Sequence, residues 1–223
     1  MSISTRVSIA WPPTIPPSEN TDTLVLSFPT NHFIDLRPLK SHDSLDWGMA
    51  GYQTSSETPQ GTKSTTTNRM KTNEIAKFIH LVDSRVPHDP LSVKDEGLFT
   101  KLPNGDDLET GTMLNPSTGH EMSYEEIWRT LPVTTDKMTL LESSGDRDKT
   151  FLGRIGRWFQ GIGVTDFDRE VHAVRGEFID GGWRTVFCVG VSGRAEYFEE
   201  KDEWKVGNEI EVNGRKWKVL CRT

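Results

Sequence analysis

Cysteine is scarce in this chain, with only Cys188 and Cys221 among 223 residues. Two widely spaced cysteines do not make the disulfide framework of a small secreted protein, which favours a reducing compartment. No apolar run approaches the roughly 18 residues that span a bilayer. The opening residues, MSISTRVSIAWPPTIPP, are broken by prolines and lack the apolar core of a signal peptide. We therefore expect a cytoplasmic protein with no membrane partner.

Positive charge is also in deficit. The chain has 26 lysines and arginines against 33 acidic residues, which gives a net charge of -7. Nucleic acids and anionic membranes select basic surfaces, so neither is an expected partner.

Motifs for phosphate binding and nucleophilic catalysis are missing as well. The segment GRIGRWFQGIG (residues 153–163) has glycines at the wrong intervals for a phosphate or dinucleotide loop, and no helix follows it. No GxSxG elbow occurs, and neither cysteine lies in an activating motif. The six histidines are scattered, without a pair at zinc-like spacing. We expect neither a metal nor a cofactor.

Aromatic residues are plentiful, with seven tryptophans and ten phenylalanines. Aliphatic content is modest, so the core must depend on these large rings. A chain of this length can form one large β domain or two small ones.

Short alternating segments separated by turn residues run through most of the chain. They lie at residues 6–11, 21–28, 32–36, 45–53, 74–85, 105–114, 137–142, 151–164, 169–179, 183–191, 209–212 and 216–221. Residues 74–85 fit either a helix or a strand, and the many strand neighbours favour a strand. Residues 54–72 are polar and predict a solvated loop. The pattern is typical of an all-β sandwich or barrel.

One helix is predicted, over residues 123–131. Ser123 can cap it, Glu126 completes a capping box, and Ile127 and Leu131 fall on one face. We expect this helix to join an N-terminal β domain, residues 1–131, to a C-terminal one, residues 132–223.

Residues 151–164, FLGRIGRWFQGIGV, carry four glycines beside large rings and polar groups. Glycine within a strand marks a bulge, a barrel corner or the close approach of a ligand. The segment is interpreted either as a kinked core strand or as the wall of a cavity with a few placed polar groups.

Polar residues in aromatic strand segments are the candidates for chemistry. They are His80 and Asp83, Asp35 and Arg37, Arg157 and Gln160, and the tyrosines Tyr52 and Tyr124. Each can equally be a buried hydrogen-bonded group or part of an exposed face. A group that polarises a carbonyl or phenol oxygen in a dry pocket can assist a reaction without a nucleophile or metal.

Several motifs, in order along the chain, resemble those of the fungal Hri family, which is named for binding a casein-kinase-I-type kinase. The resemblance rests on FIDLRP (33–38), LDWGMAG (45–51), VDSR (82–85), NPSTG (115–119), YEEIW (124–128), QG (160–161), KVG (205–207) and WKV (217–219). It implies a lipocalin-like (calycin-like) fold of two small antiparallel β-barrels or half-barrels joined by a short helix. It also implies a kinase as a partner.

The chain departs from the family pattern at Phe78 and Leu81, where relatives tend to carry tryptophan, and at Arg157-Trp158-Phe159. Such changes are expected where a barrel cavity has been repurposed. The chain also looks like the small fungal barrel proteins of biosynthetic clusters that are pericyclases, including hetero-Diels–Alderases. This second likeness is an analogy, because fold does not imply function.

Two hypotheses follow. The first is a cofactor-free pericyclase or isomerase that takes apolar terpenoid or polyketide substrates, with a homodimer as its candidate oligomeric state. Its expected catalytic residues are Arg157, Gln160 and His80, and its expected substrate-binding residues are Trp47, Phe78, Trp158, Phe159 and Tyr52. The second is a non-enzymatic protein that binds a kinase or a small molecule. It would present an exposed apolar patch or use the loop at residues 54–72.

Overall fold

Two antiparallel β-sheets make up the computed structural model, which describes residues 1–13, 15–41, 43–57, 74–143, 149–165, 169–190, 200–212 and 214–223. The first sheet contains β1 (Ser2–Trp11), β2 (Ile15–Ser18), β3 (Leu24–Ser27), β4 (His32–Pro38), β5 (Leu45–Glu57), β6 (Glu74–Asp83), β7 (Glu96–Lys101), β8 (Asp107–Leu114) and β9 (Glu121–Leu131). The second contains β10 (Met138–Ser143), β11 (Lys149–Ile155), β12 (Trp158–Val164), β13 (Val171–Ile179), β14 (Gly182–Val189), β15 (Glu209–Val212) and β16 (Arg215–Arg222).

The first sheet is a closed barrel. Its strands follow chain order from β3 to β9, and β1 pairs with both β3 and β9. Strand β2 pairs with the C-terminal end of β1. Among the described strands β1 and β3 to β9, each is paired on both sides, and such closure is how antiparallel sheets avoid association through unpaired edges.

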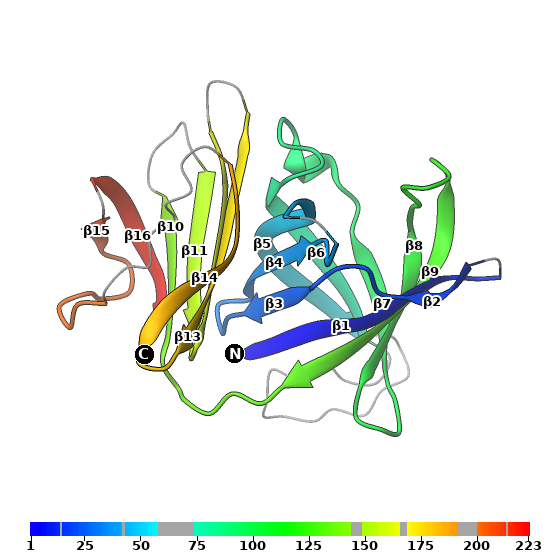
Figure 1. Ribbon diagram of the computed structural model, residues 1–223, viewed down its shortest axis with the longest axis horizontal. Coiled ribbons are helices and arrows are strands. Elements are labelled where there is room, and N and C mark those ends of the chain that lie inside the picture. The colour runs from blue at the N-terminus through cyan, green and yellow to red at the C-terminus, as the bar shows by residue number, and fades with distance from the viewer. Residues whose placement is uncertain are drawn as a thin grey trace.

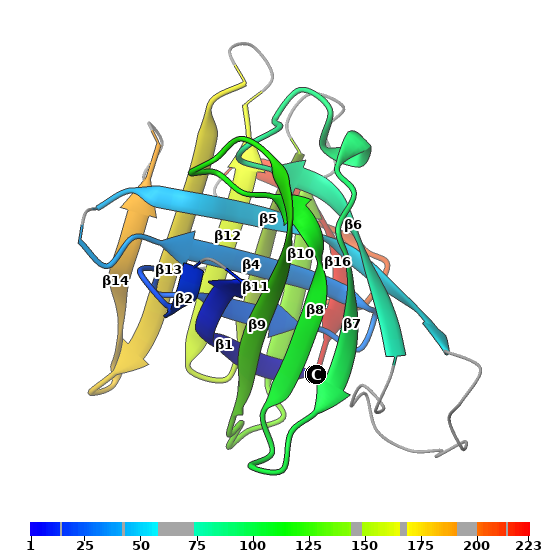
Figure 2. The same ribbon diagram turned by 90° about the vertical axis from the view of Figure 1, so that its right-hand side faces the viewer.

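The second sheet has the order β14-β13-β12-β11-β10-β16-β15, with β14 and β15 at its edges. It stands beside the barrel (Figure 1), and in the perpendicular view β4 and β5 run across its strands (Figure 2). The all-β prediction is confirmed. The open second sheet corresponds to the half-barrel alternative that the family resemblance implied.

One apolar cluster joins the two sheets. It combines Leu26, Ile34 and Leu36 from the outer face of the barrel with Phe151 and Ile162 from the second sheet. All five side chains are almost fully buried. The barrel strands lie within residues 2–131 and the second sheet within residues 138–222. Because both share this core, the predicted division into domains at residue 131 stays a prediction.

The predicted helix over residues 123–131 was wrong, because these residues belong to β9. Strand β9 pairs with β8 on one side and with β1 on the other, so its backbone hydrogen bonds go to neighbouring strands. Within the described ranges, the one helical turn is the 3-10 turn η1 (Pro90–Ser92).

Most of the predicted strand segments are strands in the structure. Residues 74–85 form strand β6, as predicted. Strand β5 runs on to Glu57, so the loop predicted from residue 54 starts later, and residues 58–72 lie outside the described residues. Residues 151–164 form two strands, not one: Gly156 and Arg157 turn the chain between β11 and β12. Gly156 has φ of 58°, a left-handed conformation that favours glycine.

Candidate functional site

Strand β4 divides its side chains between the two faces of the barrel wall. Phe33 packs with Trp47 and Met49 on the inside, whereas Ile34 and Leu36 pack against the second sheet. Successive side chains of a strand point to opposite faces. Asp35 and Arg37 have the same parity as Phe33, so they point into the barrel, and both are buried.

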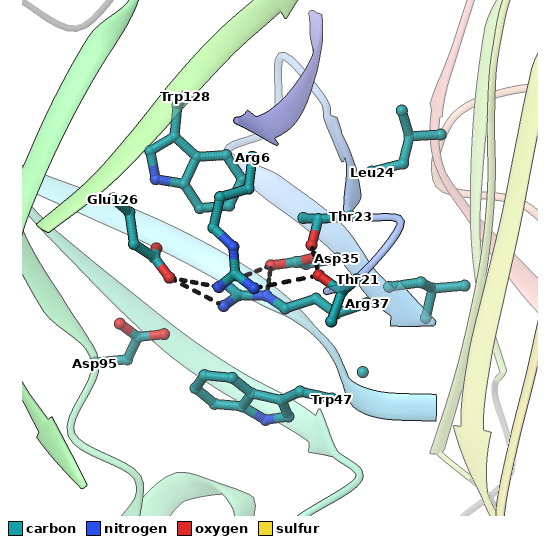
Figure 3. Close-up of polar contacts among 12 residues, drawn as sticks. Arg6, Thr21, Thr23, Leu24, Asp35, Arg37, Trp47, Asp95, Glu126 and Trp128 are labelled. Atoms are coloured by element: carbon teal, nitrogen blue, oxygen red, sulfur yellow. Dashed lines mark hydrogen bonds and ion pairs between the residues drawn. The ribbon is translucent and has the colours of Figure 1, made fainter. Parts of the chain in front are cut away.

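Inside the barrel, two arginines meet two carboxyl groups (Figure 3). Arg6 Nη1 of β1 lies 2.5 Å from Glu126 Oε1 of β9, and Arg37 Nη1 lies 3.4 Å from the same oxygen. Arg37 also donates through Nε and Nη2 to Asp35 Oδ2, at 3.0 and 2.8 Å. These four residues, Arg6, Asp35, Arg37 and Glu126, are called the barrel ion cluster below. A buried charge is tolerated only when it is paired in this way.

Tryptophans lie on both sides of the Arg37 guanidinium. Its central carbon is 4.9 Å from the ring centre of Trp47 and 5.6 Å from that of Trp128. Burial lowers the pKa of Arg37, but Asp35 and Glu126 outweigh it and raise the pKa above the ordinary value. Arg37 is therefore a permanent cation in an aromatic setting, a favourable arrangement for cation–π attraction.

Glu19 and two threonines surround the Arg6 guanidinium of the cluster. Arg6 Nε donates to Glu19 Oε2 at 2.6 Å, and Arg6 Nη2 donates to Thr21 Oγ1 at 3.2 Å. Thr21 and Thr23 share a further hydrogen bond of 2.7 Å. Glu19 has a lowered pKa, because the hydrogen bond and charge of Arg6 outweigh its desolvation. These contacts fix the Arg6 guanidinium beside that of Arg37, where both arginines share Glu126 Oε1 (Figure 3).

A second polar group surrounds His80 of β6. His80 Nδ1 is 2.7 Å from Asp83 Oδ2, and Nε2 is 3.0 Å from Asp95 Oδ2. Burial lowers the pKa of His80, yet its bonds to the two carboxylates outweigh burial and raise the pKa to about 9. Trp47 Nε1 also donates to Asp83. At neutral pH His80 is thus an imidazolium with both nitrogens engaged.

A third group is built on Glu109 of β8. Tyr124 Oη donates to Glu109 Oε1 and Trp128 Nε1 donates to Glu109 Oε2, each at 2.8 Å. Burial, with repulsion from Glu126 and Asp95, raises the pKa of Glu109 to about 8. Burial and the neighbouring carboxylates therefore favour the neutral form of Glu109 over its charged form. It also orients the Trp128 indole that faces Arg37.

Three of the predicted site residues do come together. Trp47, Phe78 and His80 all line the barrel interior around Phe33, whose ring centre is 5.5 Å from that of Phe78 and 6.2 Å from that of His80. The ring centres of Trp47 and His80 are 6.0 Å apart. Phe78 also joins a neighbouring interior cluster with Phe99.

The other predicted residues lie elsewhere. Tyr52 is 38% exposed and packs edge-on against His32. The Arg157 side chain is 65% exposed at the β11–β12 turn, where it pairs with Glu177 at 2.7 Å. Neither side chain reaches the barrel interior. Tyr52 and Arg157 therefore do not lie together with Trp47, Phe78 and His80.

The last three predicted site residues, Trp158, Phe159 and Gln160, are consecutive in β12, so their side chains alternate between its two faces. Trp158 is half-buried and packs against the cluster between the sheets. Phe159 points to the opposite face, where it packs with Trp204 and Trp217. Gln160 is buried between the sheets, and its Nε2 donates to the backbone oxygens of Leu24 and Ile34 at 3.0 Å. Gln160 therefore links the sheets and does not face the barrel interior.

Sequence reasoning missed Arg6, Glu109 and Trp128, and it assigned Glu126 to a helix cap. A usable signal was present: Tyr124, Glu126 and Trp128 share one parity in a strand, so a strand interpretation places all three on one face. No such signal existed for Arg6, because a β-bulge between Arg6 and Ser8 interrupts the alternation along β1. In the described part of the chain, no group of three or more His, Cys, Asp or Glu residues is arranged to hold a metal ion.

The fold and site define an antiparallel β-barrel protein with an ionic, aromatic-walled interior and a second sheet packed on its outside. Residues 2–220 match the family model described as "Protein HRI1". The chain belongs to the HRI1 family.

A solved structure has the same fold. The crystal structure of the uncharacterized protein YLR301w from Saccharomyces cerevisiae aligns with a TM-score of 0.78 and 18% identity, covering 100% of this chain and 98% of that one. No curated protein matches the sequence. No helix in the described ranges is long and apolar enough to cross a membrane.

Proposed function

We propose that this chain is a cofactor-free enzyme of fungal secondary metabolism that binds apolar terpenoid or polyketide partners inside the N-terminal barrel. The reaction proposed is pericyclic, of the hetero-Diels–Alder type. Two σ bonds and one new π bond form as the two π bonds of a heterodiene and the π bond of an alkene are consumed, and no group leaves. Such a reaction needs neither a nucleophile nor a metal.

The observation that carries this proposal is Arg37, a buried guanidinium between Trp47 and Trp128. Arginine has five N–H donors, and the contacts to Asp35 and Glu126 use three of them. Among the described residues, no acceptor contacts the second N–H group of Nη1 or of Nη2, and these two donors are proposed to bind a ligand oxygen. Binding sites for small molecules are typically apolar walls with a few placed polar groups, and this interior has that composition.

The physical basis is orientation together with electrostatic stabilisation. Aromatic walls that hold two apolar partners in a reactive pose supply several kcal/mol of the barrier. In the proposed site, an Arg37 N–H polarises the heterodiene oxygen as negative charge develops on it. A preorganised donor in a low-dielectric interior is more effective than the same donor in water.

This proposal changes the predicted catalytic roles. Arg37 takes the role that the sequence predicted for Arg157 and Gln160, since neither of those side chains reaches the interior. His80 becomes a positioning residue, because Asp83 and Asp95 occupy both of its nitrogens. Trp47 and Phe78 keep their proposed substrate-binding roles.

The test is an assay of cycloaddition. An ortho-quinone methide is generated in situ with a terpene alkene, and chiral chromatography measures the rate and enantiomeric excess of the product. Arg37→Gln and Arg37→Lys are both expected to lower the rate by about 10²-fold, since neither keeps the paired N–H groups. The two variants differ in buried charge, so a folding defect in one does not obscure the other.

The matched control is Arg184→Gln on β14, which removes only an exposed pair with Asp180 and should retain full activity. If Arg157→Gln abolishes activity while both Arg37 variants retain it, the site lies on the second sheet and the proposal is wrong. If the wild-type protein gives only racemic product at the uncatalysed rate, enzymatic function is rejected. The kinase-binding alternative would then be favoured, with capture of a casein-kinase-I-type kinase as its test.

A further inference from the structure

Asp35 has one carboxylate oxygen that no described residue satisfies. Its Oδ2 accepts both hydrogen bonds from Arg37, at 3.0 and 2.8 Å, whereas Oδ1 is buried without a hydrogen-bond partner. Asp35 is only 4% exposed and lies on the inward face of β4. A buried, unsatisfied carboxylate oxygen is unusual, because nearly all buried polar groups in proteins find a partner.

Hydrogen-bond donors are available beside this acceptor. Two N–H groups of Arg37 have no acceptor among the described residues, and they belong to the same guanidinium that contacts Asp35 Oδ2. Trp47 and Trp128 flank this guanidinium. The barrel ion cluster therefore offers a donor and an acceptor side by side, with apolar rings around them (Figure 3). A complementary ligand group must accept one hydrogen bond and donate another.

We propose that this pair binds the hydroxyl group of an apolar alcohol or phenol. The hydroxyl oxygen accepts from Arg37, and its hydrogen is donated to Asp35 Oδ1. This inference rests on the proposed function, which places the substrate in the barrel, and it specifies the substrate class as hydroxylated. A hydroxyl group meets both requirements with a single oxygen, since it is at once a donor and an acceptor.

Other polar groups fit less well. A ligand carboxylate would be repelled by Asp35 and Glu126, which lie on either side of Arg37. An ether or ketone accepts from Arg37 but leaves Asp35 Oδ1 unsatisfied. A site built to pair with a hydroxyl discriminates strongly against an analogue without it, because a buried partner is then left unpaired.

The experiment compares two probes of nearly equal shape, 2-naphthol and 2-methoxynaphthalene. Binding is followed by quenching of tryptophan fluorescence and checked by calorimetry. In the wild-type protein, 2-naphthol is expected to bind at least about tenfold more tightly than the ether, because only the naphthol can donate a hydrogen bond to the charged Asp35. In Asp35→Asn the affinity for 2-naphthol should fall about tenfold, while that for the ether stays the same.

The control is Asp106→Asn, which breaks another buried-acid pair, with Arg129 Nη2 at 2.8 Å, outside the barrel ion cluster. It should leave the ratio of the two dissociation constants unchanged. A merely structural role of Asp35 would weaken both probes together, so the ratio separates recognition from stability. If Asp35→Asn fails to fold, the ratio of the two dissociation constants in the wild-type protein still tests the proposal.

The outcomes separate this inference from the proposed function. Equal affinity for the two probes in the wild-type protein would mean that water satisfies Asp35, which overturns the hydroxyl site but leaves apolar binding in the barrel intact. A ratio that persists in Asp35→Asn would assign the preference to another group and also overturn it. Binding of neither probe would reject both the hydroxyl site and the proposed function.

Discussion

His80 shows how a single buried residue makes the barrel sensitive to pH. The imidazole is fully buried between Asp83 and Asp95, and its pKa is about 9 instead of 6.5. The folded state therefore binds the His80 proton more tightly than the unfolded state does. The stabilisation is complete below the unfolded pKa, near 6.5, and is lost as the pH rises through 9.

A chemical unfolding series tests this. The free energy of unfolding of the wild-type protein is compared with that of His80→Gln between pH 6 and pH 9.5, because the variant has no titrating group at this position. The advantage of the wild type should shrink by about 3 kcal/mol over this range. Glu109 also titrates here, but it contributes to both proteins and cancels in the difference. A difference that does not change with pH would contradict the assigned charge of His80.

At the scale of the element, strand β5 depends on a close approach to β6. The register of this pair shifts between Ala50 and Gly51, where the ladder contains a bulge. A Cβ atom added at Gly51 would lie 1.9 Å from the backbone oxygen of Ile79. Backbone cannot rotate away as a side chain can, so only glycine fits here. The same strand carries Trp47 to the barrel ion cluster.

Gly51→Ala is accordingly expected to lower the free energy of unfolding by about 1–3 kcal/mol, in the range of overpacked sites. The measurement is urea denaturation monitored by tryptophan fluorescence. Gly182→Ala is the matched control: Gly182 begins β14, and an added Cβ would meet no atom within 4 Å. Equal stabilities of the two variants would show that β5 and β6 can separate without cost.

At the scale of the whole molecule, a buried polar link joins the two sheets. Arg175 Nε donates to Gln160 Oε1 at 2.8 Å, and Arg175 Nη2 donates to the backbone oxygen of Leu36 at 2.8 Å. Gln160 itself reaches Leu24 and Ile34 on the barrel. Burial lowers the pKa of Arg175 to about 10, which still leaves it charged at neutral pH.

A double-mutant cycle measures this link. Gln160→Met should cost roughly 2–4 kcal/mol of stability, because it leaves Arg175 and two carbonyl groups with fewer partners. The double variant Gln160→Met/Arg175→Met should be less destabilised than the sum of the single variants, by about 1 kcal/mol or more. Additive losses would indicate that the two side chains act independently.

Much of the fold was predictable from local pattern. Alternation identified most strands, and the turns at residues 29–31 and 180–182 do join paired strands. The segment 123–131 misled, because Ser123, Glu126, Ile127 and Leu131 satisfy a helical pattern as well as a strand pattern. Its true partners, β1 and β8, include a strand more than a hundred residues away, which no local pattern contains.

The candidate site was predictable only in part. Trp47, Phe78 and His80 were recognisable as unusual residues in strands, and they do lie together. Arg157 and Gln160 looked equally promising, but a turn at Gly156 and the alternation of β12 direct them to solvent and to the contact between the sheets.

The sequence by itself determined an all-β chain rich in aromatic rings, because alternation and turn chemistry are local properties. Only the tertiary structure decided that β1 and β9 close the barrel. That closure brings Arg6 to Glu126, which are 120 residues apart, and places them beside Arg37 and Asp35. Charged side chains meet inside a barrel only after its strands have paired, since each is unfavourable there until its partner arrives.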